Sequence, residues 1–338
     1  MKKDTKQSGS DKIKQMITDR LIEGLTKAIE TGECAPWNMP WNSKTGGLPA
    51  NYKSKKRYRG VNVLVLAMQR YESPTWLSFK QALESAVSQA KGEGREIEER
   101  IVKTKRGKKV MFFENDKPFK GGVKHKEKAT PVVYWQWLYK DANGKTVKDR
   151  KLAVKSIPML RYYSVFNIAQ CEGVKDTWEA PVEANHEPIK EAQSMVEAMP
   201  NAPKIEHKEA QAYYRPSTDT VNMPRLGLFD SPESYHSTLF HELVHATGHK
   251  TRLDREGITS ATANFGSEEY SKEELVAEMG AAMLCGICGL DNAKTEQNTI
   301  SYLKSWIGKL KDDPSLAIAA GGQAQKAVDY IEGTTWEN

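Results

Sequence analysis

The sequence lacks any apolar run long enough to cross a membrane, for which about 18 consecutive apolar residues are needed. The first residues, Met1-Lys2-Lys3-Asp4, have no apolar centre of the kind found in secretion signals. Cysteine is also scarce, because only four occur among 338 residues and two of them, Cys285 and Cys288, share one short apolar stretch. That usage argues against a disulfide framework. We therefore expect a cytoplasmic protein with reduced thiols and no membrane partner.

Acidic residues are under-represented in the first half of the chain. Residues 1–170 hold 35 lysines and arginines against 17 aspartates and glutamates, a net charge of +18. The remaining residues hold 15 against 27, a net charge of −12, so the total of +6 hides two opposite halves. A basic half of this size is expected to meet a polyanion, and nucleic acid is the leading candidate.

Length and charge division together predict two domains, each with its own buried core. We expect residues 1–170 to form a basic, mixed α+β domain, with a disordered start at 1–11 and a charged insertion at about 91–119. Residues 171–188 are acidic, contain proline and show little apolar periodicity, so they are expected to be a linker. Residues 189–338 would form a second domain, and the fold class of the whole chain is α+β.

Apolar spacing and turn residues locate the expected helices and strands. Helices are predicted at 13–29, 61–71, 80–90, 189–199, 234–247, 272–288, 295–310 and 322–332. Strands are predicted at 75–79, 109–114, 130–139 and 160–167, with further short strands within 212–223 that break at Pro216. The strand at 109–114 would belong to a hairpin inside the charged insertion.

The strongest chemical signal is His241-Glu242-Leu243-Val244-His245. On a helix, His241 and His245 face the same side, so both imidazoles can reach one ion at about 2.0 to 2.1 Å. Glu242 is placed to act as general base on a water whose pKa the ion lowers towards about 7. Apolar residues fill the neighbouring positions and Gly248 follows the helix. The motif predicts a peptidase with Zn²⁺, or with another divalent transition ion such as Mn²⁺.

A catalytic zinc site needs a third protein ligand. His249 does not supply it, because the position that an extended motif requires to be histidine is Thr251. Two acidic residues, Glu274 and Glu278, lie four apart on the next strongly apolar helix. We assign Glu274 as the third ligand and Glu278 as the carboxylate that orients a ligand histidine, although the spacing also permits the reverse order.

Several other residues have chemistry but no pattern that assigns it. Cys285 and Cys288 have C-x-x-C spacing, yet their apolar neighbours favour core packing over a metal site. Tyr213, Tyr214 and Tyr270 are unranked candidates for stabilising an oxyanion. Three further histidines have no partner at a useful spacing: His186, His207 and His236.

Cations and aromatic rings alternate in one short segment of the basic half. Lysine and arginine neutralise phosphates, and aromatic faces stack on single-stranded bases. The predicted nucleic-acid contacts are Trp37, Trp41, Tyr52, Lys53, Lys55, Lys56, Arg57, Tyr58 and Arg59. Trp135 and Trp137, which alternate with Tyr134 and Gln136, could extend this platform along a strand. Charge and aromatic content do not distinguish single-stranded DNA from RNA or from an acidic protein.

Short motifs follow one another along the first half: Pro36-Trp37, Pro40-Trp41, Leu48-Pro49-Ala50-Asn51, Tyr58-Arg59-Gly60-Val61-Asn62, Trp76-Leu77-Ser78-Phe79-Lys80-Gln81 and Tyr162-Tyr163-Ser164-Val165-Phe166-Asn167. The second half adds the segments 241–248, Arg252-Leu253 and 273–277. Through these motifs, which occur in the same order, both halves resemble the ArdC-type antirestriction proteins of plasmids, phages and other mobile elements. The charged stretch between about 91 and 119 departs from the pattern.

The resemblance implies a domain that binds single-stranded DNA, a zincin-like metallopeptidase domain, and protection of incoming DNA against restriction. Our leading hypothesis is that the basic half holds single-stranded DNA while the acidic half hydrolyses a protein whose identity is unknown. The alternative is a DNA-protecting protein whose metal site is structural or vestigial.

Overall fold

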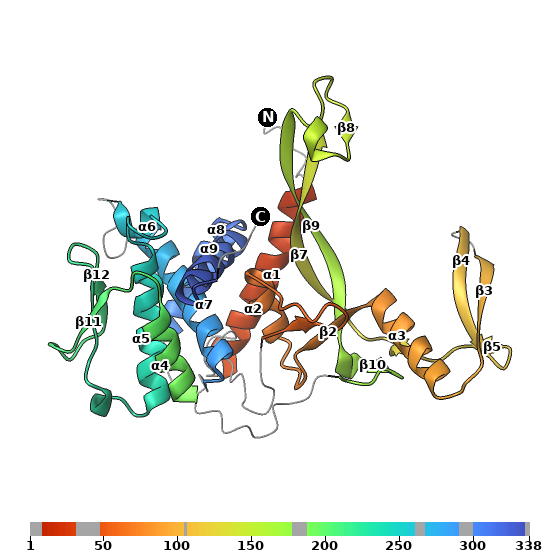
Figure 1. The fold of residues 1–338 in the computed structure, drawn as a ribbon, viewed down its shortest axis with the longest axis horizontal. Coiled ribbons are helices and arrows are strands. Elements are labelled where there is room, and N and C mark those ends of the chain that lie inside the picture. Colours follow the sequence, from red (N-terminus) through yellow and green to blue (C-terminus); the bar gives the residue numbers. More distant parts are fainter. Residues whose placement is uncertain are drawn as a thin grey trace.

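The computed structural model describes residues 9–31, 48–104, 107–177, 188–260, 268–290 and 300–334 (Figure 1). Its α-helices are α1 (Gly9–Thr31), α2 (Val61–Ala67), α3 (Phe79–Gly92), α4 (Pro188–Ala198), α5 (Pro232–Thr247), α6 (Glu256–Thr259), α7 (Glu268–Cys288), α8 (Ile300–Asp312) and α9 (Leu316–Ile331). Short 3₁₀ helices are η1 (Arg150–Leu152), η2 (Ile168–Gln170) and η3 (Leu226–Leu228).

The strands form four small sheets. They are β1 (Ala50–Asn51), β2 (Thr75–Ser78), β3 (Ile97–Thr104), β4 (Gly107–Glu114), β5 (Lys117–Pro118), β6 (Gly122–Val123), β7 (Thr130–Lys140), β8 (Thr146–Val147), β9 (Lys155–Asn167), β10 (Cys171–Glu172), β11 (Lys204–Glu206), β12 (Tyr213–Arg215) and β13 (Thr220–Asn222). The sheet orders are β1-β2-β9-β7-β8, β10-β6, β3-β4-β5 and β11-β13-β12. The two-domain α+β class predicted from the sequence is confirmed.

The longest strands, β7 and β9, pair antiparallel over their whole common length and form an arm that extends beyond the helices (Figure 1). The Asn62 side chain covers the outer edge of this arm at its base. Its amide nitrogen donates to the Val133 carbonyl at 2.8 Å and its oxygen accepts from the Val133 N–H at 2.7 Å. One side chain thus replaces a neighbouring strand at a free edge.

The charged insertion forms the hairpin expected from its β-prone segment. β3 pairs with β4 from Ile97–Glu114 to Thr104–Gly107, and the hairpin projects away from the rest of the molecule (Figure 1). Its base packs on α3 through a small cluster that includes Val87, Ala90 and Ile97.

The main hydrophobic core crosses the predicted domain boundary. Ile17 and Leu21 of α1 and Leu64 of α2 are fully buried in the same cluster as Leu243 of α5 and Val328 of α9. The basic half therefore contributes two helices to the core of the acidic half. The expectation of separate cores is corrected, because α1 and α2 have apolar faces that the N-terminal sheet alone does not cover.

Several element boundaries differ from the sequence prediction; for example, the helix predicted at 61–71 ends at Ala67, and the strand predicted at 160–167 begins at Lys155. α1 begins at Gly9, so residues 9–11, expected to be disordered, are helical, with Asp11 favourably placed in the first turn. The predicted linker 171–188 begins as a strand, because Cys171–Glu172 pair with β6. Further along it, the Asp176 carboxylate accepts a hydrogen bond from the Ser73 hydroxyl at 2.7 Å. α9 begins at Leu316 rather than at 322. The helix therefore includes Gly321. Glycine is required at this position because a Cβ would lie 2.6 Å from the backbone nitrogen of Val61, where α9 packs closely on α2.

No helix among the described residues has the length and apolar character that a membrane span requires. Cys285 and Cys288 lie buried in α7, and burial raises the pKa of the Cys288 thiol to about 12.

Candidate metal centre

Helix α5 carries the two histidines and the glutamate of the motif. Ser231 caps it by accepting the Ser234 N–H, and Pro232 occupies the first turn, where the missing N–H costs nothing. His241, Glu242 and His245 follow two turns later. Glu242 and His245 are buried, and His241 is partly buried, so the motif lies within the fold and not on a solvated helix face.

Helix α7 packs against α5 and brings Glu274 to both imidazoles. The Nε2 atoms of His241 and His245 are 3.1 Å apart. Glu274 lies 3.6 Å from the first and 3.4 Å from the second, through its two carboxylate oxygens. Three ligands held about 2.1 Å from one tetrahedral ion lie about 3.4 Å apart. The three residues therefore fit a divalent transition ion, and among the described residues they form the cluster of potential ligands that could hold one.

The other ring nitrogens face carboxylates as well. Nδ1 of His241 lies 3.7 Å from Glu278, and Nδ1 of His245 lies 3.4 Å from Glu273. A carboxylate behind each imidazole fixes which nitrogen turns towards the ion and increases the basicity of that nitrogen. Glu274 faces both Nε2 atoms, whereas Glu278 faces Nδ1 of His241. This arrangement agrees with Glu274 as the third ligand and Glu278 as the carboxylate that orients a ligand histidine.

A buried arginine holds Glu273 in place. Arg255 approaches its two oxygens at 2.6 and 3.0 Å, and also donates to the Thr247 hydroxyl and the Val244 carbonyl of α5. Gly248 permits this, because a Cβ there would lie 3.1 Å from the guanidinium and 2.5 Å from Ile258. The arginine thus ties the end of α5 to α7.

Charge in the site favours cations. Burial opposes protonation of His241, but the surrounding carboxylates, Glu274 first and then Glu278 and Glu242, together outweigh burial and raise its pKa to about 9. The carboxylates of Glu273, Glu274 and Glu242 together outweigh burial at His245 and raise its pKa to about 10. Burial would raise the pKa of Glu274, yet the two histidines hold it well below its usual range. A divalent ion would replace the protons that these groups share.

A cavity of about 340 Å³ opens at this cluster, and Glu242 lines it. Tyr213 and Tyr214 of β12 also line it. The Tyr214 hydroxyl donates to Asp219 at 2.9 Å, and burial together with Asp219 raises its pKa. The Tyr213 hydroxyl accepts from Arg215 at 2.9 Å. For Tyr270, the third oxyanion candidate, the side chain lies outside the described residues.

Comparison with known proteins places both halves of the chain. Residues 11–166 match the N-terminal domain of the anti-restriction factor ArdC, and residues 190–323 match a zincin-like metallopeptidase domain. The chain has the two-domain organisation of the ArdC-type antirestriction proteins. The crystal structure of the ArdC protein of plasmid R388 in its metal-free form is 29% identical, with a TM-score of 0.64 over 95% of this chain and 96% of that one. The Mn(II)-bound form of that protein gives a TM-score of 0.63.

Two curated relatives have similar sequences. A DNA primase TraC of Escherichia coli is 29% identical over 340 residues, which cover 94% of this chain but 27% of TraC. The chain thus spans about a quarter of the length of that relative. An uncharacterized protein y4eC of Sinorhizobium fredii is 29% identical over 93% of this chain and 91% of its own length.

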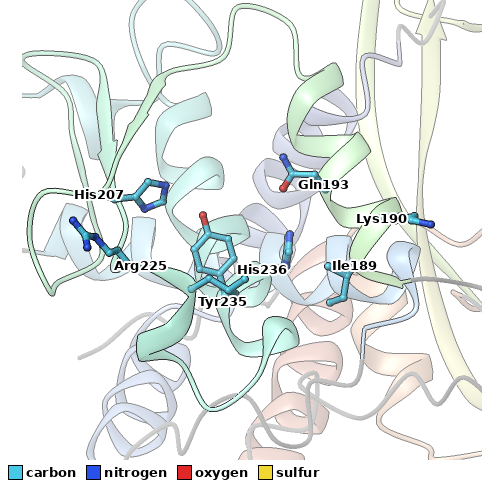
Figure 2. A pocket seen from close by; sticks show the side chains of 8 residues that line it. Ile189, Lys190, Gln193, His207, Arg225, Tyr235 and His236 are labelled. Carbon is cyan, nitrogen blue, oxygen red and sulfur yellow. The ribbon is translucent and has the colours of Figure 1, made fainter.

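The ArdC-type chain has a second, larger cavity at the beginning of α5. It measures about 620 Å³, and Figure 2 shows Tyr235 between His207 and Arg225 on one side and His236 on the other. Nδ1 of His236 lies 2.9 Å from the Pro232 carbonyl, and Nδ1 of His207 lies 3.0 Å from the Met223 carbonyl. Both histidines lie apart from the metal centre, while His186 falls outside the described residues.

The predicted DNA contacts divide into exposed and structural residues in this ArdC-type fold. Lys53, Lys55, Lys56 and Arg57 are exposed. Tyr58 is 8% exposed and packs with Trp76 in a core cluster, so it offers no stacking face. Arg59 forms an ion pair with Asp329 of α9, and the Tyr52 hydroxyl donates to the Lys175 carbonyl. Trp37 and Trp41 lie outside the described residues.

Sequence reasoning did not assign Glu273 or Arg255 a role. Glu273 was visible as the neighbour of Glu274, but spacing on a helix does not show that an arginine from a separate loop meets it. Arg255 is found by its burial, at 6% exposure, because a guanidinium so deep in the fold requires a carboxylate partner.

Proposed function

We propose that this protein binds single-stranded DNA through its N-terminal half and hydrolyses peptide bonds at the centre formed by His241, His245 and Glu274. The proposal rests on one observation above all: three potential ligand residues converge, with their ligand atoms 3.1 to 3.6 Å apart, beside an open cavity. The Mn(II)-bound ArdC protein of R388 supports a divalent ion, and we propose Zn²⁺ or Mn²⁺. The activity would protect incoming DNA against restriction in the cytoplasm.

The carboxylates of the site have different roles in the proposed hydrolysis. When bound, a divalent ion supplies Lewis-acid chemistry, which polarises a carbonyl and activates water. Glu242, at the wall of the cavity, accepts the proton of the attacking water and returns it to the leaving nitrogen. Glu278 and Glu273 hold the two imidazoles through their Nδ1 atoms. The Glu242 carboxylate thus carries the transferred proton, while Glu278 and Glu273 orient the imidazoles.

An extended peptide is the substrate class that best fits this cavity. Among the described strands, β12 lies at the edge of its three-stranded sheet and contributes Tyr213 and Tyr214 to the cavity wall. An edge strand has backbone donors and acceptors that can pair with an added chain. A peptide aligned along β12 would pass Glu242, which supports a protein as the substrate.

The test is the Glu242→Gln variant of the full chain, compared with wild type in the presence of Zn²⁺ or Mn²⁺. Hydrolysis of casein, with and without single-stranded DNA, should fall about 10²- to 10⁴-fold because the general base is lost. Metal content and DNA affinity should stay unchanged, because glutamine preserves the shape of a residue outside the ligand set. Equal hydrolysis by the variant would show that the peptidase proposal is wrong.

The rival function is DNA protection with a structural metal site. It predicts that Glu242→Gln protects transferred DNA as well as wild type does, and that neither protein hydrolyses casein. Titration with single-stranded DNA, duplex DNA and single-stranded RNA over a range of salt concentrations tests the nucleic-acid half separately.

A further inference from the structure

We propose that one face of the β7–β9 arm, the face that carries Tyr134 and Tyr163, is the surface that stacks on and neutralises single-stranded DNA. The inference rests on the proposed DNA binding and gives it a location. That location differs from the extension through Trp135 and Trp137 that the sequence suggests.

The register divides the arm into two chemically different faces. Residues directly opposite each other in an antiparallel pair share a face. One face, here called the tyrosine face, is made of the pairs Lys140–Lys155, Leu138–Ile157, Gln136–Met159, Tyr134–Arg161 and Val132–Tyr163. The other, the tryptophan face, is made of the pairs Tyr139–Ser156, Trp137–Pro158, Trp135–Leu160, Val133–Tyr162 and Pro131–Ser164.

Rings and cations coincide on the tyrosine face. Tyr134 and Tyr163 are 44% and 40% exposed, and their ring centroids lie 5.8 Å apart. Arg161 stands directly opposite Tyr134 and donates to the neutral Gln136 side chain at 3.3 Å. Within the described residues, no carboxylate forms an ion pair with Arg161. A positive charge is thus available beside two accessible rings.

The far end of the tyrosine face carries a pair of like charges. Lys140 and Lys155 lie directly opposite each other, which destabilises a sheet unless an anion is present between them. From Val132 to Lys140 the face extends over about 27 Å at the usual rise of a strand. Arg161 near the base and the two lysines at the tip place cations at both ends of that length, where they can contact separate phosphates of one strand.

The near end of the same face meets the exposed basic turn. Asn51 of β1 shares a face with Trp76 of β2, and Trp76 packs with Val132 and Val165 on the tyrosine side of the sheet. The Asn51 side-chain oxygen accepts the N–H groups of Lys53 and Ser54, which fixes the turn that carries the exposed lysines. The predicted basic run therefore continues the tyrosine face.

The tryptophan face has the larger rings but no charge. Trp135 and Trp137 are each 53% exposed, yet none of the ten residues paired on that face is a lysine or arginine. At its base, Val133 and Leu160 belong to the main core with α1 and α2. This face lacks the cations that a polyanion requires, so we assign the DNA to the opposite one.

The test compares matched double variants of the full chain on the two faces. Tyr134→Ala with Tyr163→Ala removes both rings of the tyrosine face, and Trp135→Ala with Trp137→Ala removes the two largest rings of the other. Binding to a fluorescent oligothymidylate of about 20 nucleotides is measured by anisotropy over a range of salt concentrations.

Loss of the two tyrosine rings should weaken binding at least about thirtyfold, because each lost stack reduces affinity at least about fivefold. The tryptophan pair should bind within about threefold of wild type, and Tyr134→Phe with Tyr163→Phe should restore binding, because phenylalanine stacks as well. Arg161→Gln should reduce the salt slope by about one.

A crosslinking measurement on the wild-type chain covers the case in which the tyrosine variant fails to fold. An oligonucleotide that contains 5-iododeoxyuridine should crosslink to Tyr134 or Tyr163, and crosslinks confined to Trp135, Trp137 or Tyr162 would overturn the assignment. If wild type binds the oligonucleotide and the tyrosine variant binds equally, the location alone is wrong. If wild type binds no single-stranded DNA, the proposed function fails with it.

Discussion

Replacing Arg255 by methionine should destabilise the protein and weaken its metal centre together. The guanidinium is 6% exposed and its partner Glu273 is 4% exposed, so both charges lie out of contact with water. Methionine would fill much of the same space but would leave the Glu273 carboxylate buried without its cation. Removing one partner of a buried pair costs about 3 to 5 kcal/mol. Against a typical total stability of about 5 to 15 kcal/mol, that is a large fraction.

The loss of Arg255 should also lower metal affinity, through its effect on the ligand His245. Arg255 positions Glu273, which lies 3.4 Å from Nδ1 of that histidine. Removing a carboxylate behind a ligand imidazole lowers metal affinity about 10- to 100-fold, and a displaced Glu273 should produce an effect of the same order. The Glu273→Gln variant should reproduce both consequences, because it removes the charge of the other partner in the same buried pair while keeping the shape of the side chain.

Two measurements check this prediction. Urea unfolding with a chelator present gives the free energy of unfolding of the metal-free chain, and competition with a chromogenic chelator at constant pH gives the metal affinity. Arg95→Met is the matched control, because Arg95 binds Glu114 through two hydrogen bonds but is exposed and should change stability far less. A change below about 1 kcal/mol for Arg255→Met, or an unchanged metal affinity, would refute the reasoning.

Two further predictions concern helix packing and pH. Gly321→Ala should lower the free energy of unfolding by about 1 to 3 kcal/mol, because its Cβ would lie 2.6 Å from the Val61 nitrogen. The control Gly322→Ala has open space around its Cβ and should not destabilise the protein. Equal urea midpoints for the two variants would contradict this prediction. Metal affinity should fall as pH falls below about 9, because the ion must then displace protons from His241 and His245. The surrounding carboxylates together outweigh burial and raise the pKa values of these two histidines to about 9 and 10. Without metal the sign reverses: these raised pKa values stabilise the fold fully below about pH 6.5, and the contribution is lost as pH rises through 9 and 10. A chelated chain equally stable at pH 6 and 10 would contradict this assignment.

Periodicity located most elements because apolar positions repeat with the geometry of the helix or strand. The predictions at 13–29, 130–139 and 234–247 correspond to α1, β7 and α5. Boundaries set by tertiary contact were less predictable. The closing helix predicted at 322–332 begins at Leu316 as α9, and the close approach of Val61 requires a residue without Cβ at Gly321.

Surface and core roles of aromatic residues were not readable from composition. Tyr58 and Trp135 look alike in sequence, since each stands among polar or aromatic neighbours. Yet Tyr58 is buried under the sheet while Trp135 is 53% exposed. Burial depends on which strand lies beside which, and local sequence does not contain that information.

By itself, the sequence determined the chemistry that is encoded locally: the motif at 241–245, the spacing of Glu274 and Glu278, and the opposite charges of the two halves. These follow from helix geometry and from counting charges, which need no partner element. Only the tertiary structure decided that Glu274 faces both Nε2 atoms, that Arg255 holds Glu273, and that the rings of β7 point to two faces of different charge. Those facts depend on contacts between segments far apart in the chain, and such contacts exist only once the chain is folded.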